Sequence, residues 1–346
     1  FASALVGFIK GGLSMINIAT SMFFAEISGS AVADVAALGS ILIPAMKKKG
    51  YPGPFAAAVT SSSASLAIII PPSIPMIVYA VMAQSSVVQL FVAGVVPGII
   101  GGFLMMFAAY IYARRKNLPI EENFNLVNLR KTAKEAALAF LLPIIILGGI
   151  FGGVVTATEG AGLAVVAALI IGLIYREFDF KRLYQAATEG AIQTAAVMLL
   201  VAASVLLGEF LTVEQIPQKV AESIIDMTQN KYAVLAILNV FLLIIGFFLH
   251  SVAAIILTVP IVMPLVNAVG IDPVHFGIIV TLNLAIGQQT PPVASVLVTA
   301  CSVAKADIWD VTRANIMFIC VLLFLLMLVT YVPAVPMTLV EFFYRS

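Results

Sequence analysis

Long apolar segments alternate with short polar ones along the whole chain. A helix needs about 17–25 mostly apolar residues to cross a bilayer, and several of these segments are interrupted by Gly, Pro or Ser. The pattern predicts an all-α polytopic membrane protein. The apolar segments are 11–27, 31–46, 53–83, 88–113, 136–154, 158–175, 183–211, 231–249, 251–269, 274–302 and 311–333. Two amphipathic stretches, 119–135 and 212–230, are too polar to span and are predicted to lie along the interface.

An internal repeat relates the two halves of the chain. A shift of 220 positions places Pro71-Pro72 on Pro291-Pro292. Proline and glycine matches in an apolar background favour a duplication over chance. Because three spans (136–211) precede the second hairpin, we expect three before the first, in about 85 residues upstream of Phe1. At the same offset Ile41 matches Ile261, Pro44 matches Pro264, Gly50 matches Gly270 and Ala80 matches Ala300.

The repeat predicts the organisation of the chain, namely inverted repeats with two helical hairpins and two broken helices. The first repeat is expected at 1–113, with a hairpin at 11–48, a broken helix at 53–83 and a following helix at 88–113, its N-terminal scaffold helices missing. An amphipathic cytoplasmic arm (114–135) and the scaffold and interfacial helices of the second repeat (136–230) follow. The second core (231–333) has a hairpin at 231–269, a broken helix at 274–302 and a last helix at 311–333, before a tail at 334–346.

The basic residues orient the chain in the membrane. Five crossings separate the two hairpins, so they enter from opposite faces. Most Lys and Arg residues then share one face, which the positive-inside rule makes cytoplasmic. The first hairpin therefore opens from the cytoplasm and the second from outside. On the cytoplasmic face lie Lys10, Lys47, Lys48, Lys49, Arg114, Arg115, Lys116, Arg130, Lys131, Lys134, Arg176, Lys181, Arg182, Lys305 and Arg313, and on the other Lys219, Lys231 and Arg345.

Composition narrows the class of protein. Hydrophobic residues make up 62% of the 346 positions and charged residues 10%, with a mean hydropathy of +1.12. Soluble domains have about 45–50% apolar and about 25% charged residues. The high apolar and low charged content excludes a soluble enzyme, a nucleic-acid binder and a disordered linker. A net charge of +1 predicts no acidic partner, and two cysteines in apolar stretches, Cys301 and Cys320, predict neither a disulfide framework nor a metal site.

The two double prolines interrupt predicted helices at matching repeat positions. A proline lacks the N–H that would bond the carbonyl four residues back. Pro71 and Pro72 should therefore release the carbonyls of Ala67 and Ile68, and Pro291 and Pro292 those of Gly287 and Gln288. Unwound backbone survives at membrane depth only where something binds it, and Na⁺ binds carbonyl and hydroxyl oxygens. Paired breaks favour a transporter site; simple proline kinks are the alternative.

Small polar residues form the predicted hairpin tips, and half-helix N-termini converge there. Such N-termini favour an anionic or polyhydroxylated solute, whereas close helix packing through small residues is the alternative. The candidate Na⁺ ligands are Ser28, Gly29, Ser30, Ser65, Ala67 and Ile68 in the first repeat, and His250, Ser251, Gly287, Gln288 and Thr290 in the second. The candidate solute ligands are Ser61, Ser62, Ser63, Ser73, Gln288, Gln289 and Ser295.

The acidic residues singled out inside predicted spans are Glu26, Asp34, Glu159 and Glu209. A charge at the bilayer centre costs at least about 2.5–3.5 kcal/mol, so we expect them to face away from lipid. Asp34 is a candidate to cap a helix or coordinate an ion near the first tip; a packing role is the alternative. Thr156-x-x-Glu159 matches a helix capping box.

Catalytic signatures are absent from the sequence. It has no His-Glu-x-x-His, no Gly-x-Gly-Asp and no P-loop lysine. His250 beside Ser251 is only adjacency in sequence and does not indicate an activated nucleophile. We therefore predict a protein that is not an enzyme, in which transport depends on an ion gradient or is passive.

With these motifs in view, the chain resembles the large membrane subunit (M component) of tripartite ATP-independent periplasmic (TRAP) transporters. The resemblance implies an elevator-type transporter of the bacterial inner membrane, with Na⁺ as coupling ion and no organic cofactor. It also implies a small four-helix membrane partner (Q), in some members fused upstream, and a periplasmic solute-binding protein (P). The matching stretches are Gly-Gly-Leu at 11–13, Ile27-Ser-Gly-Ser-Ala-Val-Ala-Asp34, Ala37-Leu-Gly-Ser-Ile-Leu-Ile-Pro-Ala-Met46, Gly50-Tyr51, Ile70-Pro-Pro-Ser-Ile74 and Thr290-Pro-Pro-Val293.

Four positions depart from the common pattern of this family. Many members have Gly where Glu26 and Ala294 stand, and apolar residues where Gln288 and Gln289 stand. The added polarity suits a solute with more hydroxyls than a C4-dicarboxylate, and the chain most resembles the sialic-acid members. We therefore predict N-acetylneuraminate as the solute, with a C4-dicarboxylate next. A stand-alone ion-coupled carrier and a channel or scaffold are the other hypotheses. Candidates for the binding-protein surface are Glu214, Glu222 and Asp226.

Overall fold

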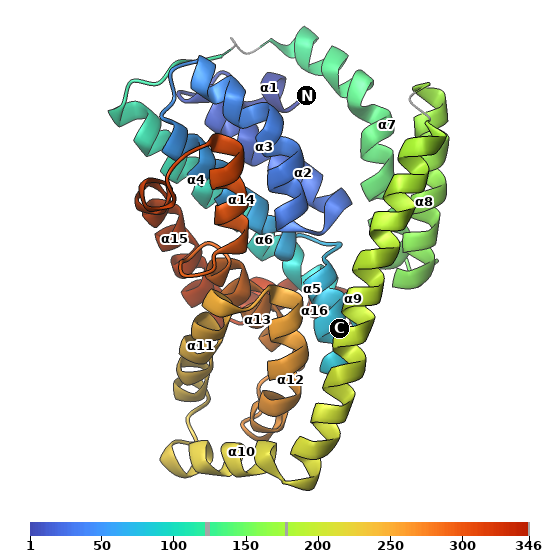
Figure 1. The fold of residues 1–346 in the computed structure, drawn as a ribbon, viewed down its shortest axis with the longest axis vertical. Helices are drawn as coiled ribbons and strands as arrows, with labels where there is room; N and C mark the ends of the chain where they lie inside the picture. Colours follow the sequence, from blue (N-terminus) through green and yellow to red (C-terminus); the bar gives the residue numbers. More distant parts are fainter. Residues whose placement is uncertain (122–124, 177–178, 345–346) are drawn as a thin grey trace.

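The computed structural model describes residues 1–121, 125–176 and 179–344, and in these ranges the secondary structure is helical, without β-strands. Figure 1 shows the arrangement. The elements are α1 (Ala2–Val6), α2 (Gly12–Ser28), α3 (Ala31–Lys48), α4 (Gly53–Ala64), the 3₁₀ helix η1 (Ser65–Ile68), α5 (Ile74–Met82), α6 (Val87–Arg115), α7 (Leu126–Phe151), α8 (Ala157–Ile174), α9 (Phe180–Val213), α10 (Ile216–Met227), α11 (Lys231–Phe248), α12 (Ser251–Ala268), α13 (Pro273–Gly287), α14 (Ser295–Ala304), α15 (Ile308–Tyr331) and α16 (Ala334–Tyr344).

The predicted hairpins and broken helices are present. α2 and α3 form the first hairpin and α11 and α12 the second. The first broken helix is α4–η1 followed by α5, and the second is α13 followed by α14. Pro71 and Pro72 lie in the first break and Pro291 and Pro292 in the second, and the peptide bond within each pair is cis. Each break falls where proline removes a helical hydrogen bond.

The two copies of this unit pack together reciprocally. The second arm of each hairpin lies against the restarted half-helix of the other copy: α3 packs on α14, and α12 packs on α5. Likewise α4 packs on α15, and α13 packs on α6. This exchange of neighbours is the pattern expected of two related units facing one another. It places both breaks inside one apolar core, in which α4 and α13 are buried almost throughout.

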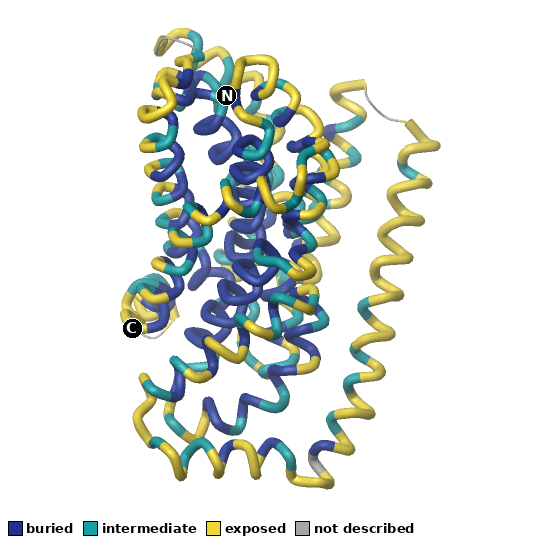
Figure 2. Tube along the Cα trace, turned by 60° about the vertical axis from the view of Figure 1, so that its left-hand side comes forward, coloured by how far each residue is buried: buried dark blue, intermediate teal, exposed yellow. Residues whose placement is uncertain are grey.

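A second group of helices lies outside this core. α7 and α8 pack on each other, while α9 runs along the molecule and contacts α12 and α10. With 34 residues and a rise of about 1.5 Å per residue, α9 is about 50 Å long. Most of its residues are exposed (Figure 2). α10 lies across one end of the molecule (Figure 1), as expected of an interfacial helix in the predicted stretch 212–230.

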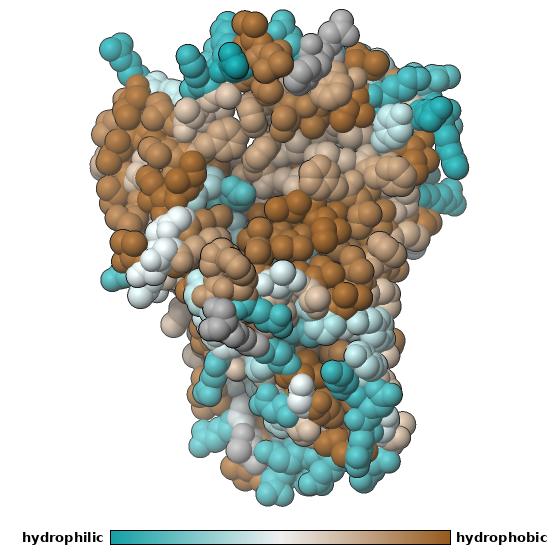
Figure 3. Space-filling view, turned by 180° about the vertical axis from the view of Figure 1, so that it is seen from behind, coloured by the Kyte–Doolittle hydropathy of each residue, from teal (hydrophilic) through white to brown (hydrophobic). Residues whose placement is uncertain are grey.

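The surface is that of a membrane protein. Seven helices in the described part of the chain are long and apolar enough to cross a bilayer, namely α6 to α9, α11, α12 and α15. Figure 3 shows apolar side chains over much of the back face, with hydrophilic side chains at the two ends. The α3–α4, α6–α7 and α8–α9 connections lie at the end opposite α10 (Figure 1). These connections and the helix ends next to them carry most of the basic residues assigned to the cytoplasmic face, whereas Arg345 lies outside the described residues.

Two segments differ from the sequence prediction. Residues 126–135 are the first turns of α7 rather than a separate interfacial arm. The Asn125 side chain caps α7, accepting a hydrogen bond from the Val127 amide at 2.9 Å, and no Pro or Gly interrupts 126–142. The remainder of the predicted arm includes residues 122–124, which are outside the described part. The predicted tail is the helix α16 up to Tyr344, and it packs along α6.

Candidate substrate and ion site

The tip of the first hairpin touches the break in the first broken helix. Gly29, between α2 and α3, has φ +60°, a conformation that residues with a side chain rarely adopt. A Cβ placed on Gly29 would lie 2.9 Å from the Pro72 carbonyl oxygen and 3.4 Å from the Ile74 nitrogen. Glycine is therefore needed here both for the turn and for the close approach of two backbones. The approach brings the Ser-Gly-Ser tip to the unwound segment.

A carboxylate with one unsatisfied oxygen lies at this tip. The Ser28 hydroxyl donates to Asp34 Oδ1 and accepts a hydrogen bond from the Ser30 amide at 3.3 Å. Asp34 is fully buried, and its Oδ2 has no hydrogen-bond partner among the described residues. Buried polar atoms are nearly always paired, so Oδ2 is a candidate ligand for a cation. Residues Ser28, Ser30 and Asp34 thus form an oxygen-rich tip.

The carbonyls expected to be free near Pro71 and Pro72 are partly engaged. The Ile68 carbonyl accepts a hydrogen bond from the Ser73 hydroxyl at 2.7 Å. The same hydroxyl caps α5, accepting from the Met76 amide at 3.5 Å. The Ser65 hydroxyl donates to the Ser62 carbonyl at 2.6 Å. Ser73 therefore stabilises the restart of the helix, and both hydroxyls already have protein partners.

The second hairpin meets the second break in the same way. The Val293 amide donates to the Phe247 carbonyl at 3.3 Å, which joins the break to the end of α11. At the neighbouring residue of α11, this helix crosses α13 at two glycines: a Cβ on Gly287 would lie 2.4 Å from the carbonyl carbon of Gly246. The Gly287 carbonyl, expected to be free, accepts from the Thr290 amide at 3.0 Å. Each hairpin tip is thus held against the break of its own repeat.

Residues of the second tip are placed next to this contact. His250 is the N-cap of α12, and its side chain makes no capping hydrogen bond. Ser251 begins the helix and is buried. The Thr290 hydroxyl donates to the Ile286 carbonyl at 3.0 Å. This tip could offer backbone carbonyls and one hydroxyl to a prospective ion. Among the described residues it has no buried carboxylate oxygen like Asp34 Oδ2, but Asn283 Oδ1, on α13 before the break, is a buried oxygen without a partner.

Gln289 joins the two broken helices. Its Nε2 donates to the Ser61 carbonyl in α4 at 2.6 Å. Asn315 of α15 donates to Gln289 Oε1 at 3.3 Å and accepts from the Ser62 hydroxyl at 2.5 Å. Gln289 and Asn315 are fully buried. Both ends of the Gln289 amide are therefore occupied by protein, and its role in this structure is to connect α4, α15 and the second break.

Gln288 differs from its neighbour. Its Oε1 accepts a hydrogen bond from the Ser295 hydroxyl at 3.3 Å, while its Nε2 is buried and without a partner among the described residues. Only 2% of Gln288 is exposed. Leaving such a donor unsatisfied costs about 1–3 kcal/mol, so a ligand that accepts a hydrogen bond would be stabilised here. Gln288 is the free donor of the site.

The serine row of α4 is placed in the core rather than on an open cavity. Ser61, Ser62 and Ser63 are fully buried. The Ser61 hydroxyl donates to the Ala58 carbonyl at 3.1 Å, and Ser63 pairs with Ser21 of α2 at 2.8 Å. These hydroxyls bind neighbouring turns or helices, which gives the row a packing function in this structure.

The sequence analysis did not single out Asn315, although a lone Asn in the apolar segment 311–333 was a usable signal.

Comparison with known proteins decides the family. A sequence profile described as "Tripartite ATP-independent periplasmic transporter, DctM component" matches residues 1–335. The chain belongs to this family. The resemblance drawn from the hairpin and double-proline motifs is thereby confirmed. Together with the seven apolar helices, membership makes this DctM-family chain a multi-pass protein of the bacterial inner membrane.

Curated relatives of the DctM-family chain differ in the solute that they are named for. It is 42% identical to the isethionate TRAP transporter permease protein DctMQ of Oleidesulfovibrio alaskensis, over 97% of the chain and 53% of that relative. It is 39% identical to the C4-dicarboxylate TRAP transporter large permease protein DctM of Pseudomonas aeruginosa, over 98% and 80%. The sialic acid TRAP transporter large permease protein SiaM of Vibrio cholerae is 35% identical, over 99% and 81%. The chain thus spans about half the length of the first relative and about four fifths of the others.

The acidic residues of the DctM-family chain have different surroundings. The capping box is confirmed: the Thr156 amide donates to Glu159 Oε2 at 2.8 Å, and the Glu159 amide donates to the Thr156 hydroxyl at 3.3 Å. Asp34 is buried and Glu26 half-buried. The expectation that all four acids turn inward is wrong for Glu159, which is exposed at the start of α8, and for Glu209, which is exposed on α9. The reason is that α8 and α9 lie apart from the core and bury few of their residues.

Proposed function

We propose that this chain is the membrane core of a Na⁺-coupled importer of a small organic anion. The observation that carries the proposal is a pair of unsatisfied buried groups, Asp34 Oδ2 at the first hairpin tip and Gln288 Nε2 at the second break. A carboxylate oxygen without a partner attracts a cation, and an amide N–H without a partner attracts an anion or carbonyl. The two contacts between tips and breaks keep both groups inside an apolar core, where these attractions are strong.

Sodium fits the first tip best. The residues that would hold it are Asp34, Ser28 and Ser30 with backbone carbonyls of the break, including Ala67 and Ile68. Bound there, the ion would supply a positive charge that favours an anionic solute. At the second tip His250, Ser251, Gly287, Gln288 and Thr290 remain candidates, mainly through their backbone carbonyls and one hydroxyl.

The hydrogen bonds at the second break support an order among the proposed solute ligands, from residues with a free polar group to residues already bound to protein. Gln288 has a free donor, and Ser295 is bound to its other end. Ser61, Ser62, Ser63, Ser73 and Gln289 are engaged with protein groups, so binding through them would require these bonds to exchange. We therefore place the solute first at Gln288 and Ser295. Because Gln288 and Gln289 are more polar than the residues common in the family, we retain N-acetylneuraminate as the predicted solute. A C4-dicarboxylate and isethionate are the alternatives, since relatives are named for each.

The proposed assembly follows the names of the relatives. We expect a small four-helix Q subunit and a periplasmic binding protein that delivers the solute, with the hairpins and broken helices moving together as an elevator. Glu214, Glu222 and Asp226 are exposed on or beside α10, at the end opposite the basic loops. They remain the candidate contacts for the binding protein.

Uptake into proteoliposomes tests the proposal. The chain is reconstituted with its partner subunit and offered labelled N-acetylneuraminate, a C4-dicarboxylate or isethionate, with and without an inward Na⁺ gradient and the binding protein. We expect saturable uptake of one solute that requires both. Uptake unchanged without the Na⁺ gradient overturns the coupling, and uptake without the binding protein indicates a stand-alone carrier. Flux that does not saturate indicates a channel.

Single variants locate the ion. Asp34→Asn should raise the Na⁺ concentration that gives half-maximal uptake, because the amide carries no charge for the cation. Ser30→Ala in the first repeat and Thr290→Ala in the second should likewise raise the Na⁺ concentration that gives half-maximal uptake in the same assay. Wild-type Na⁺ dependence in all three variants would contradict the placement of sodium at the tips.

A further inference from the structure

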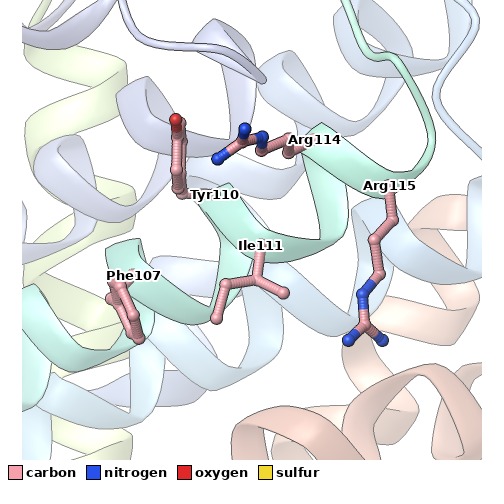
Figure 4. A pocket seen from close by; sticks show the side chains of 5 residues that line it. All are labelled: Phe107, Tyr110, Ile111, Arg114 and Arg115. Atoms are coloured by element: carbon pink, nitrogen blue, oxygen red, sulfur yellow. The ribbon is translucent and has the colours of Figure 1, made fainter.

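A shallow groove lies on the outer face of α6, away from the broken helices. Its lining residues are Phe107, Tyr110, Ile111, Arg114 and Arg115, and its volume is about 400 Å³. We call it the α6 groove. Figure 4 shows these side chains on the last turns of α6, with Phe107, Ile111 and Arg115 directed to one side of the helix and Tyr110 and Arg114 to the other.

The groove continues an exposed apolar stripe. Phe103, Phe107 and Ile111 follow one another at intervals of four residues, which places them on one face of a helix. Their exposed fractions are 65%, 62% and 36%. From Phe103 to Arg114 the helix rises about 16 Å, close to half of the roughly 30 Å hydrocarbon core. The stripe thus has the length of one lipid leaflet.

Two exposed positive charges end this stripe. Arg114 and Arg115 are exposed, and neither is within ion-pair distance of a carboxylate in the described residues; the ion pairs found there join other residues. They lie in the last turn of α6, at the end of the molecule that carries the basic loops and is assigned to the cytoplasm. Arginine binds phosphate through two parallel hydrogen bonds, and the cytoplasmic leaflet is rich in anionic lipid.

We propose that the α6 groove binds one anionic phospholipid. Its headgroup phosphate lies at the end of α6, between Arg114 on the Tyr110 side and Arg115 on the other, and an acyl chain runs along Ile111, Phe107 and Phe103. A free phosphate would use the arginines but gain nothing from the stripe, and a zwitterionic lipid would use the stripe with less gain from the charges. The arginines together with the apolar stripe therefore favour a ligand that has both an anionic headgroup and an acyl chain. The site is independent of the proposed transport function, because none of these residues lies at a hairpin tip or a break.

Native mass spectrometry of the purified chain tests this site. The chain is titrated with phosphatidylglycerol or phosphatidylcholine of the same acyl chains, and inorganic phosphate is added as a competitor. We expect phosphatidylglycerol to bind about tenfold more tightly than phosphatidylcholine. The double substitution Arg114→Gln with Arg115→Gln should remove this preference, and Phe107→Ala should weaken both lipids equally.

A matched control separates a site from general charge. Lys181 and Arg182 form another exposed basic pair, at the start of α9 on the same end of the molecule. Lys181→Gln with Arg182→Gln removes equal charge and should keep the preference. An equal loss in this control, no preference in the wild type, or full competition by millimolar phosphate would each overturn the proposal. If the double arginine variant does not fold, Arg115→Gln alone is compared with Lys181→Gln alone.

Discussion

The side-chain amide of Gln289 donates a 2.6 Å hydrogen bond to the backbone carbonyl of Ser61, across 228 positions of sequence. This bond connects the break of the second repeat to the first broken helix. Asn315 completes the connection by binding the other end of the same amide. The two repeats are therefore joined at their interrupted helices by side chains as well as by apolar packing.

Adjacent glutamines should give different phenotypes. Gln289→Leu removes two buried hydrogen bonds, one to the Ser61 carbonyl and one from the Asn315 amide, each worth about 0.5–1.5 kcal/mol. The Ser61 carbonyl keeps its bond from the Ser65 amide, and the Asn315 amide keeps its bond to the Gln289 carbonyl. We expect a clear fall in Tm. Gln288→Leu removes a buried donor that has no protein partner, which favours folding, and one 3.3 Å bond from Ser295, which opposes it. Tm should therefore stay close to wild type while the KM for the solute rises. Thermal unfolding and uptake kinetics of both variants check this, and equal Tm changes would contradict the distinction.

Gly29→Ala should impair Na⁺-dependent uptake. The new methyl group would lie 2.9 Å from the Pro72 carbonyl, so the tip must move away from the break. We expect a higher Na⁺ concentration for half-maximal uptake. Gly270→Ala is the control, because Gly270 has φ +68° but nothing within 4 Å of an added Cβ. It bears the same backbone strain without the contact, and a matching change in its Na⁺ dependence would assign the effect to strain alone.

Gly287→Ala should destabilise the second repeat. An added Cβ would lie 2.4 to 2.6 Å from backbone atoms of Gly246, and backbone cannot move aside as a flexible side chain does. Overpacking of this kind typically costs about 1–3 kcal/mol. Gly148→Ala, in α7, meets no atom within 4 Å and should leave Tm unchanged or slightly raised, since Ala favours a helix. Similar Tm values for the two variants would refute the tight crossing.

Ala294→Gly should stabilise the protein. Ala294 has φ +44° and ψ +53° and is almost fully buried. For a residue with a Cβ, this left-handed conformation costs about 1–2 kcal/mol. Glycine adopts it without that cost but loses more entropy on folding, so the expected net gain is below about 1 kcal/mol. A small rise in Tm with unchanged solute preference supports this reading, and a fall in Tm opposes it.

Some features of the fold depend on short stretches of chain, and the sequence predicted them. Both hairpins, both helix breaks at Pro71-Pro72 and Pro291-Pro292, and the Thr156–Glu159 capping box are present as expected. At residues 126–135 the predicted amphipathic arm is continuous with the following span, because the Asn125 cap starts one helix that includes both. Similarly, the predicted tail is α16, which α6 holds by packing.

By itself, the sequence determined that the protein crosses a membrane, that it contains two related halves, and where its helices stop. These properties depend on local hydropathy and on the missing N–H of proline. Only the tertiary structure decided that Gln289 is engaged and Gln288 is free, that Gly29 meets Pro72, and that Asp34 keeps one oxygen without a partner. Identical residue types in neighbouring positions acquire different roles because their hydrogen-bond partners come from helices that are distant in sequence.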